Sequence, residues 1–197
     1  MSASQAPEFA EPEAGGKTHH RLLKIQRAGR GFRPVFLALA LLLPVSICAY
    51  WLLQPVLPHA MRATTHAAYF VAQEPGLGIR LAALLVNLPA ALMGAGAAWS
   101  LARLMGLYGA GRVFTRETVR CFVLVGRFLL LGTLAHIPAR PMLSVALTWS
   151  NPPGQKALAL TFGSADLMGL VAGGVVLLMA RVMEEGRALD EDRRLTV

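Results

Sequence analysis

LAALLVNLPAALMGAGAAWSLA, residues 81–102, contains no charged side chain over 22 residues and lies between Arg80 and Arg103. A helix needs about 20 predominantly apolar residues to cross the hydrocarbon core of a bilayer, so this run is long enough to span it. Three further runs have the same character: residues 34–53 carry no charge, residues 121–137 carry only Arg127, and residues 157–180 carry only Asp166. The sequence therefore predicts an all-α integral membrane protein, a bundle of four transmembrane helices.

The composition excludes a typical soluble domain. Mean hydropathy is +0.51, hydrophobic residues make up 55% of the 197 residues, and charged residues only 15%. The formal net charge of +8 would suit nucleic acid if the basic side chains formed one surface, but they stand mainly at the ends of the apolar runs. We therefore expect them to set the membrane topology and to contact phospholipid headgroups. The lipid bilayer is the expected partner, with no direct contact to nucleic acid.

Lysine and arginine are distributed unequally between the two sides that a four-crossing chain defines. Fourteen fall on one side: Lys17, Arg21, Lys24, Arg27, Arg30, Arg33, Arg103, Arg112, Arg116, Arg120, Arg181, Arg187, Arg193 and Arg194. Four fall on the other: Arg62, Arg80, Arg140 and Lys156. Because cytoplasmic loops carry the excess of Lys and Arg, both termini are predicted to be cytoplasmic.

The predicted domain organisation has three parts: a cytoplasmic tail at 1–33, a four-helix transmembrane domain at 34–186, and a cytoplasmic C-terminal tail at 187–197. The transmembrane helices are expected at about residues 34–53, 80–104, 116–137 and 157–184. Residues 1–16 are rich in Ala, Pro, Glu, Ser and Gly without a period, so they are expected to be disordered. The basic segment 18–33 fits either a short interfacial helix on the anionic inner leaflet or a plain basic flank.

Small residues recur at helical spacing in two of the runs, and they predict how the helices pack. Ala90, Gly94, Ala98 and Ala102 form one stripe, and Ala165, Gly169 and Gly173 form another. Such stripes let helix backbones approach closely in a bilayer, where lipid offers no hydrophobic drive for association. We expect these two faces to meet within the bundle, with contact between two copies of the chain, a homo-oligomer, as the alternative.

The apolar runs contain few polar side chains, and three of them lie at a similar depth. At 1.5 Å per residue from the cytoplasmic helix ends, Asn87, His136 and Asp166 come out about 24–26 Å deep, with Arg140 one turn further out. An ionised Asp in hydrocarbon costs about 2.5–3.5 kcal/mol, so Asp166 is expected to face the bundle. His136 is its expected partner and Arg140 the next, with Asn87 completing the network. Two interpretations are open: a pH- or ligand-sensitive site reached from the outer side, or a polar clamp between helices.

The segment YGAGRVFTRETVR, residues 108–120, is the most distinctive part of the predicted cytoplasmic side. Its glycines are expected to end one helix, and Thr115 is expected to cap the next. Phe114 is apolar in a basic loop, so we expect it to pack with the apolar chain end 195–197 or against a partner, or else to dip into the headgroup layer. The candidate partner surface comprises Arg112, Phe114, Thr115, Arg116, Glu117, Leu189, Leu195, Thr196 and Val197.

Gly111-Arg-Val-Phe-Thr-Arg-Glu-Thr-Val119 resembles the G-x-[VF]-F-[ST]-x-[EN]-N-[VI] segment of the bacterial domain-of-unknown-function 2975 family. The end of the chain, EEGRALDEDRRLTV at 184–197, resembles that family's closing segment of a glycine, a leucine, an acidic cluster and a final Leu-Thr-Val. The matching positions are Gly111, Phe114, Thr115, Glu117, Val119, Gly186, Leu189, Leu195, Thr196 and Val197. The chain departs from the pattern at Thr118, where the family usually has Asn. The four-helix pattern extends the similarity to about residues 34–197.

The resemblance implies a small four-helix membrane protein from a family without an established activity, in which some members are encoded beside a small helix-turn-helix regulator. It favours a regulatory or sensory protein of the bacterial inner membrane whose cytoplasmic loop and tail hold a soluble partner, such as a helix-turn-helix regulator. The alternative is a small transporter or channel subunit. Against it stand the lack of an internal repeat and the scarcity of intramembrane polar groups.

An enzyme is the least favoured class. No apolar run holds a paired-carboxylate or multi-histidine arrangement, Ser100 and Ser144 have no neighbouring base, and Gly109-x-Gly111 is too short for a phosphate loop. We therefore expect no catalytic residue, no cofactor and no metal ion.

Overall fold

The computed structural model is built from helices, and no strand occurs among the residues that it describes. Its elements are α1 (Glu13–Leu53), the short 3-10 helix η1 (Gln54–Val56), α3 (Leu77–Gly109), α4 (Arg116–Thr148) and α5 (Ser164–Leu195). The described residues are 13–58, 61–63, 65, 69, 71, 74–112, 115–149, 151–156, 158–160 and 162–195, with no side chain described for 13–26, 28 and 189–195.

Four helical segments are long and apolar enough to cross a membrane: Gly29–Val56, Leu77–Gly109, Arg116–Thr148 and Ser164–Ala188. Large apolar side chains cover their outward faces, among them Leu41, Leu85 and Met168, which are each more than half exposed. Such faces suit a bilayer rather than water. The predicted all-α, four-helix membrane protein is confirmed.

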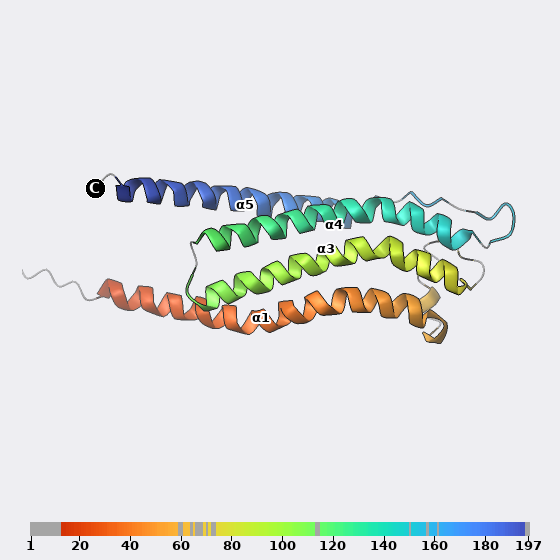
Figure 1. Cartoon of the computed structure of the whole chain (residues 1–197), viewed down its shortest axis with the longest axis horizontal. Coiled ribbons are helices and arrows are strands. Elements are labelled where there is room, and N and C mark those ends of the chain that lie inside the picture. The colour runs from red at the N-terminus through yellow and green to blue at the C-terminus, as the bar shows by residue number, and fades with distance from the viewer. Residues whose placement is uncertain are drawn as a thin grey trace, which may run out of the picture.

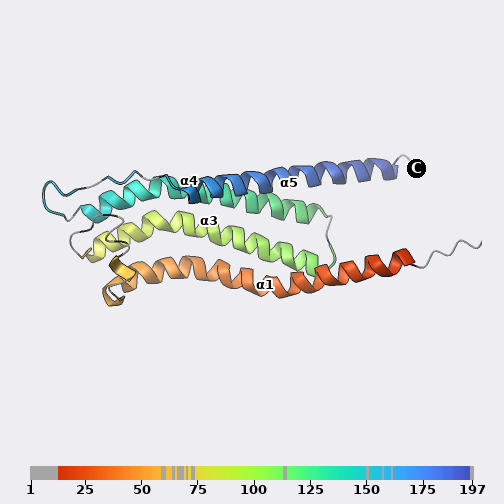
Figure 2. The same cartoon turned by 180° about the vertical axis from the view of Figure 1, so that it is seen from behind.

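The four long helices lie side by side in chain order, α1 next to α3, α3 next to α4, and α4 next to α5 (Figures 1 and 2). Among the described residues, the extensive helix–helix contacts are limited to these consecutive pairs. Both ends of the described chain lie at the same end of the molecule as the α3–α4 connection, and we call this the basic end. The α1–α3 and α4–α5 connections lie at the opposite end, the far end (Figures 1 and 2).

Glycines allow the neighbouring helices to approach closely. A Cβ atom on Gly29 of α1 would lie 2.7 Å from the backbone oxygen of Met105 in α3, and one on Gly173 of α5 would lie 2.8 Å from Cγ of Leu130 in α4. A side chain at either position would push the helix pair apart. The stripe that contains Gly173 therefore packs on α4, while Gly94 of the other stripe faces Leu43 of α1. The prediction that the two stripes meet is wrong, because α4 lies between α3 and α5 and these two helices make no extensive contact in the described part of the chain.

The far end holds the main cluster of buried apolar side chains, formed by Trp51, Val71, Ala83, Leu143 and Leu147. Two of these belong to the last turns of α4, which continues to Thr148 and not to residue 137 as predicted. Pro138 and Pro141 lie inside this helix. A proline removes one backbone hydrogen bond and usually bends a membrane helix without ending it. Burial of Leu143 and Leu147 offsets that loss.

The last helix begins later than the sequence predicted, at Ser164 and not at residue 157. Gly163 is its N-cap, because its carbonyl oxygen accepts hydrogen bonds from the backbone N–H groups of Asp166 and Leu167 at 3.0 and 3.3 Å. Residues 158–160, which we call the strap, are non-helical chain held on α4, because the N–H of Ala159 donates to Oγ of Ser144 at 3.0 Å. The apolar run therefore contains both a strap and a helix.

Two helices extend beyond the predicted bounds at the basic end. α1 begins at Glu13 and runs without interruption through the predicted tail at 1–33, while α5 continues to Leu195, past the predicted end at residue 184. Because Gly29 lies against Gly109, the last residue of α3, the part of α1 before Gly29 projects past α3. We call residues 13–28 of α1 and 188–195 of α5 the two arms (Figures 1 and 2).

Candidate functional site

Asp166 is the centre of a polar cluster between α4 and α5. Its side chain is only 2% exposed, and Oδ1 lies 3.2 Å from Nδ1 of His136. The other oxygen, Oδ2, lies 3.3 Å from Nη1 of Arg140. His136 and Arg140 are four residues apart on α4, so both face the same neighbouring helix. The structure thus brings together three of the four residues predicted for this cluster.

Asp166 also caps its own helix. The backbone N–H of Gly163 donates to Oδ2 of Asp166 at 2.9 Å, while the carbonyl of Gly163 accepts from the N–H of Asp166. The carboxylate that reaches back to the N-cap N–H from the third helical position is one half of a capping box, and Gly163 has no side chain to supply the other half. A carboxylate in the first turn is further stabilised by the helix dipole. One side chain therefore both starts α5 and joins it to α4.

Asn87 does not join the cluster. Its Nδ2 donates to the backbone oxygen of Ala83, one turn earlier in α3, at 2.8 Å. The depth estimate placed Asn87 at the right level but carried no information about which way the amide turns. An amide can bond a carbonyl of its own helix, and in lipid this is a sufficient partner.

A groove of about 280 Å³ runs beside the cluster, and α4 forms its floor between α3 and α5. It is lined by Ala90, Gly94, Phe128, Leu129, Gly132, Thr133, His136, Ala165 and Asp166. On the far-end side of the cluster, Arg140 reaches Tyr69 of the α1–α3 connection electrostatically: burial raises the pKa of the Tyr69 phenol, and the Arg140 guanidinium opposes this. Arg140 thus serves both the cluster and the far-end connection.

The α3–α4 connection at the basic end is a compact turn with a defined hydrogen-bond pattern. Gly111 has a positive φ of 76°, which glycine adopts without strain. The N–H of Arg112 donates to the oxygen of Leu107 at 2.9 Å, and the N–H of Gly111 donates to that of Tyr108 at 3.0 Å. These two bonds form a Schellman motif, which ends α3 and explains the glycine of the matched segment.

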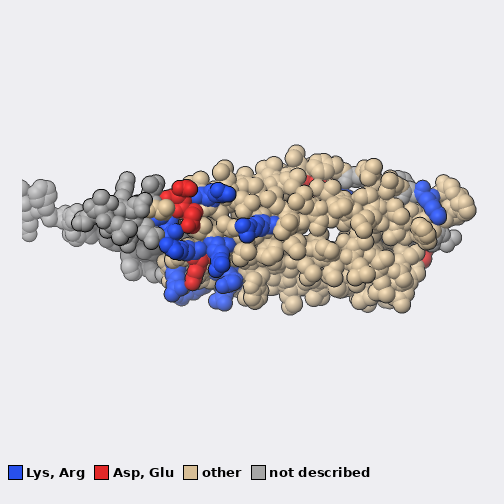
Figure 3. Space-filling view, turned by 45° about the horizontal axis from the view of Figure 1, so that its top comes forward, with Lys and Arg blue, Asp and Glu red and all other residues tan. Residues whose placement is uncertain are grey.

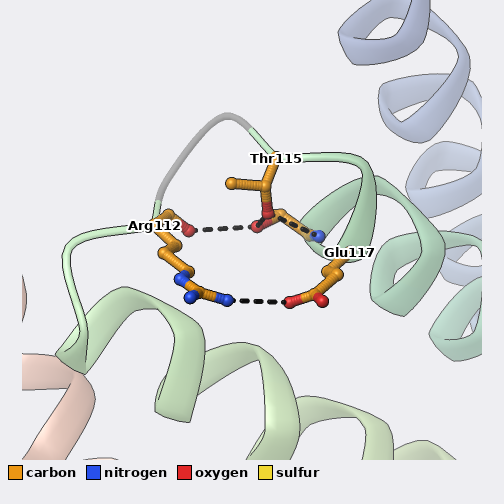
Figure 4. A network of polar contacts seen from close by, with 4 residues as sticks. Arg112, Thr115 and Glu117 are labelled. Atoms are coloured by element: carbon orange, nitrogen blue, oxygen red, sulfur yellow. Dashed lines mark hydrogen bonds and ion pairs between the residues drawn. The ribbon is translucent and has the colours of Figure 1, made fainter.

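Thr115 and Thr118 start the next helix. Thr115 is the N-cap of α4, and its Oγ1 accepts from the N–H of Thr118 at 3.3 Å, as predicted for a capping residue. The hydroxyl of Thr118 is fully buried and donates to the backbone oxygen of Arg112 at 3.1 Å (Figure 4). From the sequence, Thr118 was only the position where the chain departs from the family segment. In the structure its hydroxyl stabilises the turn before α4.

The predicted partner surface is solvent-exposed where the structure describes its charged side chains. Arg112 and Glu117 form an ion pair at 3.4 Å, with both side chains more than 60% exposed, and Arg116 is also exposed (Figure 4). Phe114, Thr196 and Val197 lie outside the described residues, as do the side chains of Leu189 and Leu195. Figure 3 shows Lys and Arg gathered toward the basic end among a few acidic side chains, with few at the far end.

Comparison with known proteins identifies a family, while no curated protein and no solved structure matches the chain at a significant level. A family model described as "Protein of unknown function (DUF2975)" matches residues 34–197, which are most of the chain and include the turn at Gly111, the cluster at Asp166 and the C-terminal segment. The chain, with its four helices long and apolar enough to span a membrane, therefore belongs to the DUF2975 family.

Proposed function

We propose that this chain is a regulatory or sensory protein of the bacterial inner membrane, with its basic end in the cytoplasm, and that this end holds a soluble protein. The expected partner is a small helix-turn-helix regulator. In this proposal the chain performs no catalysis and needs no cofactor or metal ion. It controls the amount of regulator that is free by keeping part of it at the membrane.

The observation that carries the proposal is the geometry of the basic end. Residues 13–28 of α1 and 188–195 of α5 project past the α3–α4 turn on the same side of the molecule (Figures 1 and 2). At 1.5 Å per residue the two arms extend about 24 and 12 Å. They are too polar to enter the bilayer and lie beyond the helix contacts of the membrane part, so a soluble protein can reach them.

Gly186 gives independent support. It lies inside α5, where glycine costs about 1 kcal/mol relative to alanine. A Cβ atom at this position would meet nothing within 4 Å in the described part of the chain. Packing within the molecule therefore does not require the glycine, whereas close approach of a second backbone would.

The test is affinity purification of the tagged full-length protein from its own host, with and without residues 186–197. We expect the full chain to retain a soluble protein that the truncated chain loses. The point variant Gly186→Ala should weaken retention at least about threefold while stabilising α5. Gly174→Ala is the matched control, because Gly174 also has nothing within 4 Å of its Cβ but lies in the apolar run 157–180, which a soluble protein does not reach. Equal retention by all four proteins would contradict the proposal.

A small transporter or channel subunit is the second candidate, and the groove beside Asp166 and His136 is the observation that favours it. The polar side chains at this groove form one cluster in which Asp166 pairs with His136 and Arg140. Because, among the described residues, they do not continue along the membrane part, they do not outline a path across it. A flux assay in proteoliposomes separates the two candidates. Transport that is lost in Asp166→Asn would support the second, and retention of a soluble partner without flux would support the first.

A further inference from the structure

Three arginines from three different helices meet at one pocket at the basic end. The pocket has a volume of about 400 Å³ and is lined by Arg33 of α1, by Arg103, Gly106 and Leu107 of α3, and by Glu117, Arg120, Cys121 and Leu124 of α4. Two glycines, Gly29 of α1 and Gly106 of α3, determine where Arg33 lies. The approach of Gly29 to α3 brings Arg33 across Gly106, where a Cβ atom would lie 3.7 Å from Nε of the guanidinium.

The positive charge of this pocket is only partly offset within the described part of the chain, because three arginines and a single carboxylate, that of Glu117, line it. Arg33, Arg103 and Arg120 have no ion-pair partner there. The Glu117 carboxylate also pairs with Arg112 at 3.4 Å, and Glu184 pairs with Arg187 at 2.9 Å. Three cations around so small a volume repel one another, and a bound anion removes that repulsion.

The level of the pocket and its other walls indicate the kind of anion. Arg33 directly precedes the uncharged run 34–53, and Arg103 directly follows the uncharged run 81–102. These arginines therefore lie where an apolar run meets the headgroup layer. The remaining wall is formed by Leu107, Cys121 and Leu124 with the bare backbone of Gly106. An anionic head with an apolar body fits these walls better than a small free anion does.

We propose that this pocket is a binding site for the phosphate group of an anionic phospholipid. Guanidinium groups suit phosphate because their planar N–H pairs match two of its oxygens. Basic pockets between transmembrane helices are a recurring way to hold anionic headgroups. The arginines that form the site belong to α1, α3 and the first turns of α4 and not to the arms, and Glu117 is the one lining residue that it shares with the proposed partner surface.

The test uses the full-length protein, purified in detergent and freed of lipid, and counts bound lipids by native mass spectrometry. We expect one molecule of phosphatidylglycerol to bind at least about tenfold more tightly than phosphatidylcholine or phosphatidylethanolamine, a difference of about 1.4 kcal/mol. Arg103→Gln with Arg120→Gln should abolish this preference. Arg127→Gln with Arg181→Gln removes the same charge from arginines that do not line this pocket and should keep the preference. Equal losses in the two double variants would contradict the site.

A variant that changes no charge guards against misfolding of the arginine variants. Gly106→Val should intrude into the pocket and displace the Arg33 guanidinium, because the atoms nearest to a Cβ there belong to the Arg33 side chain. We expect it to weaken phosphatidylglycerol binding about as much as the double arginine variant does. Wild-type affinity in Gly106→Val would overturn the assignment. Displacement of the lipid by millimolar inorganic phosphate would identify a free-anion site and overturn the lipid assignment as well.

Discussion

Asp166 shows how one residue performs two structural tasks. It accepts from the N–H of Gly163 to begin α5, and it holds His136 and Arg140 of α4. The pairing was predictable because a buried carboxylate in a membrane needs a partner at its own depth. The capping role was not predicted, because it depends on where α5 begins, and the strap at 158–160 conceals that boundary in an unbroken apolar run.

Substitution of Asp166 by Asn should lower the free energy of unfolding by about 2–3 kcal/mol. The amide keeps a hydrogen-bond acceptor for Gly163, but it leaves the buried side of Arg140 without its counter-charge. Thermal unfolding of the purified protein, followed by circular dichroism, measures the effect. His136→Ala should cost less, since His136 is 42% exposed. A larger loss in His136→Ala than in Asp166→Asn would contradict this ranking.

The same pair of variants separates the clamp from a sensor. If the cluster only joins helices, both variants change stability and neither changes a response to external pH. A sensor requires a pH-dependent change in partner retention in the wild-type protein that disappears in His136→Ala. Partner retention measured across external pH in intact cells decides between them, and a wild-type protein that does not respond removes the sensor.

Replacement of Gln54 at the far end by an apolar residue should stabilise the protein. Its side chain is 1% exposed, and neither Nε2 nor Oε1 has a hydrogen-bond partner among the described residues. An unsatisfied buried amide costs about 1–3 kcal/mol. Gln54→Met keeps the shape and removes the amide, so we expect the midpoint of thermal unfolding to rise. A fall of several degrees would mean that the amide is satisfied in the membrane.

At the scale of the elements, the number and identity of the helices were predictable, while their ends were less so. A long uncharged run indicates a span whatever its neighbours are, because the bilayer sets the length. The helix ends depend on tertiary contacts that an apolar run does not show. The helix α4 continues past two prolines because Leu147 is buried, and α5 begins only after its N-cap, Gly163. The turn before α4 was predictable because Thr115 and Gly111 act locally.

The α3–α4 turn provides a prediction at this scale. Gly111→Ala places a side chain at a φ of 76° and should lower the free energy of unfolding by about 1 kcal/mol. Gly111→Asn should cost less, because asparagine tolerates this conformation. Gly154→Ala, at a φ of 90° in the α4–α5 connection, is the control for the same strain at the far end. Only the Gly111 variant should reduce partner retention. An equal reduction in both variants would mean that the α3–α4 turn is not part of the partner surface.

At the scale of the whole molecule, the unequal distribution of arginine leads to a prediction of orientation. Reporter fusions after Arg33, after Arg112 and after Val197 should report the cytoplasm, and a fusion after Glu74 should report the opposite side. The structure places the first two sites at the basic end and Glu74 at the far end, where it pairs with Arg62 at 2.7 Å. A cytoplasmic signal from the Glu74 fusion would invert or break this topology.

The packing of each helix on its chain neighbour has a consequence for biosynthesis. Since α3 packs on α1, α4 on α3, and α5 on α4, every helix that leaves the ribosome finds its partner already inserted. Contact order is low in such an arrangement, so assembly can follow translation without waiting for a distant segment. The last helix is also separable, because α5 packs on α4 alone among the long helices of the described chain and can dock or detach while the three earlier helices stay assembled.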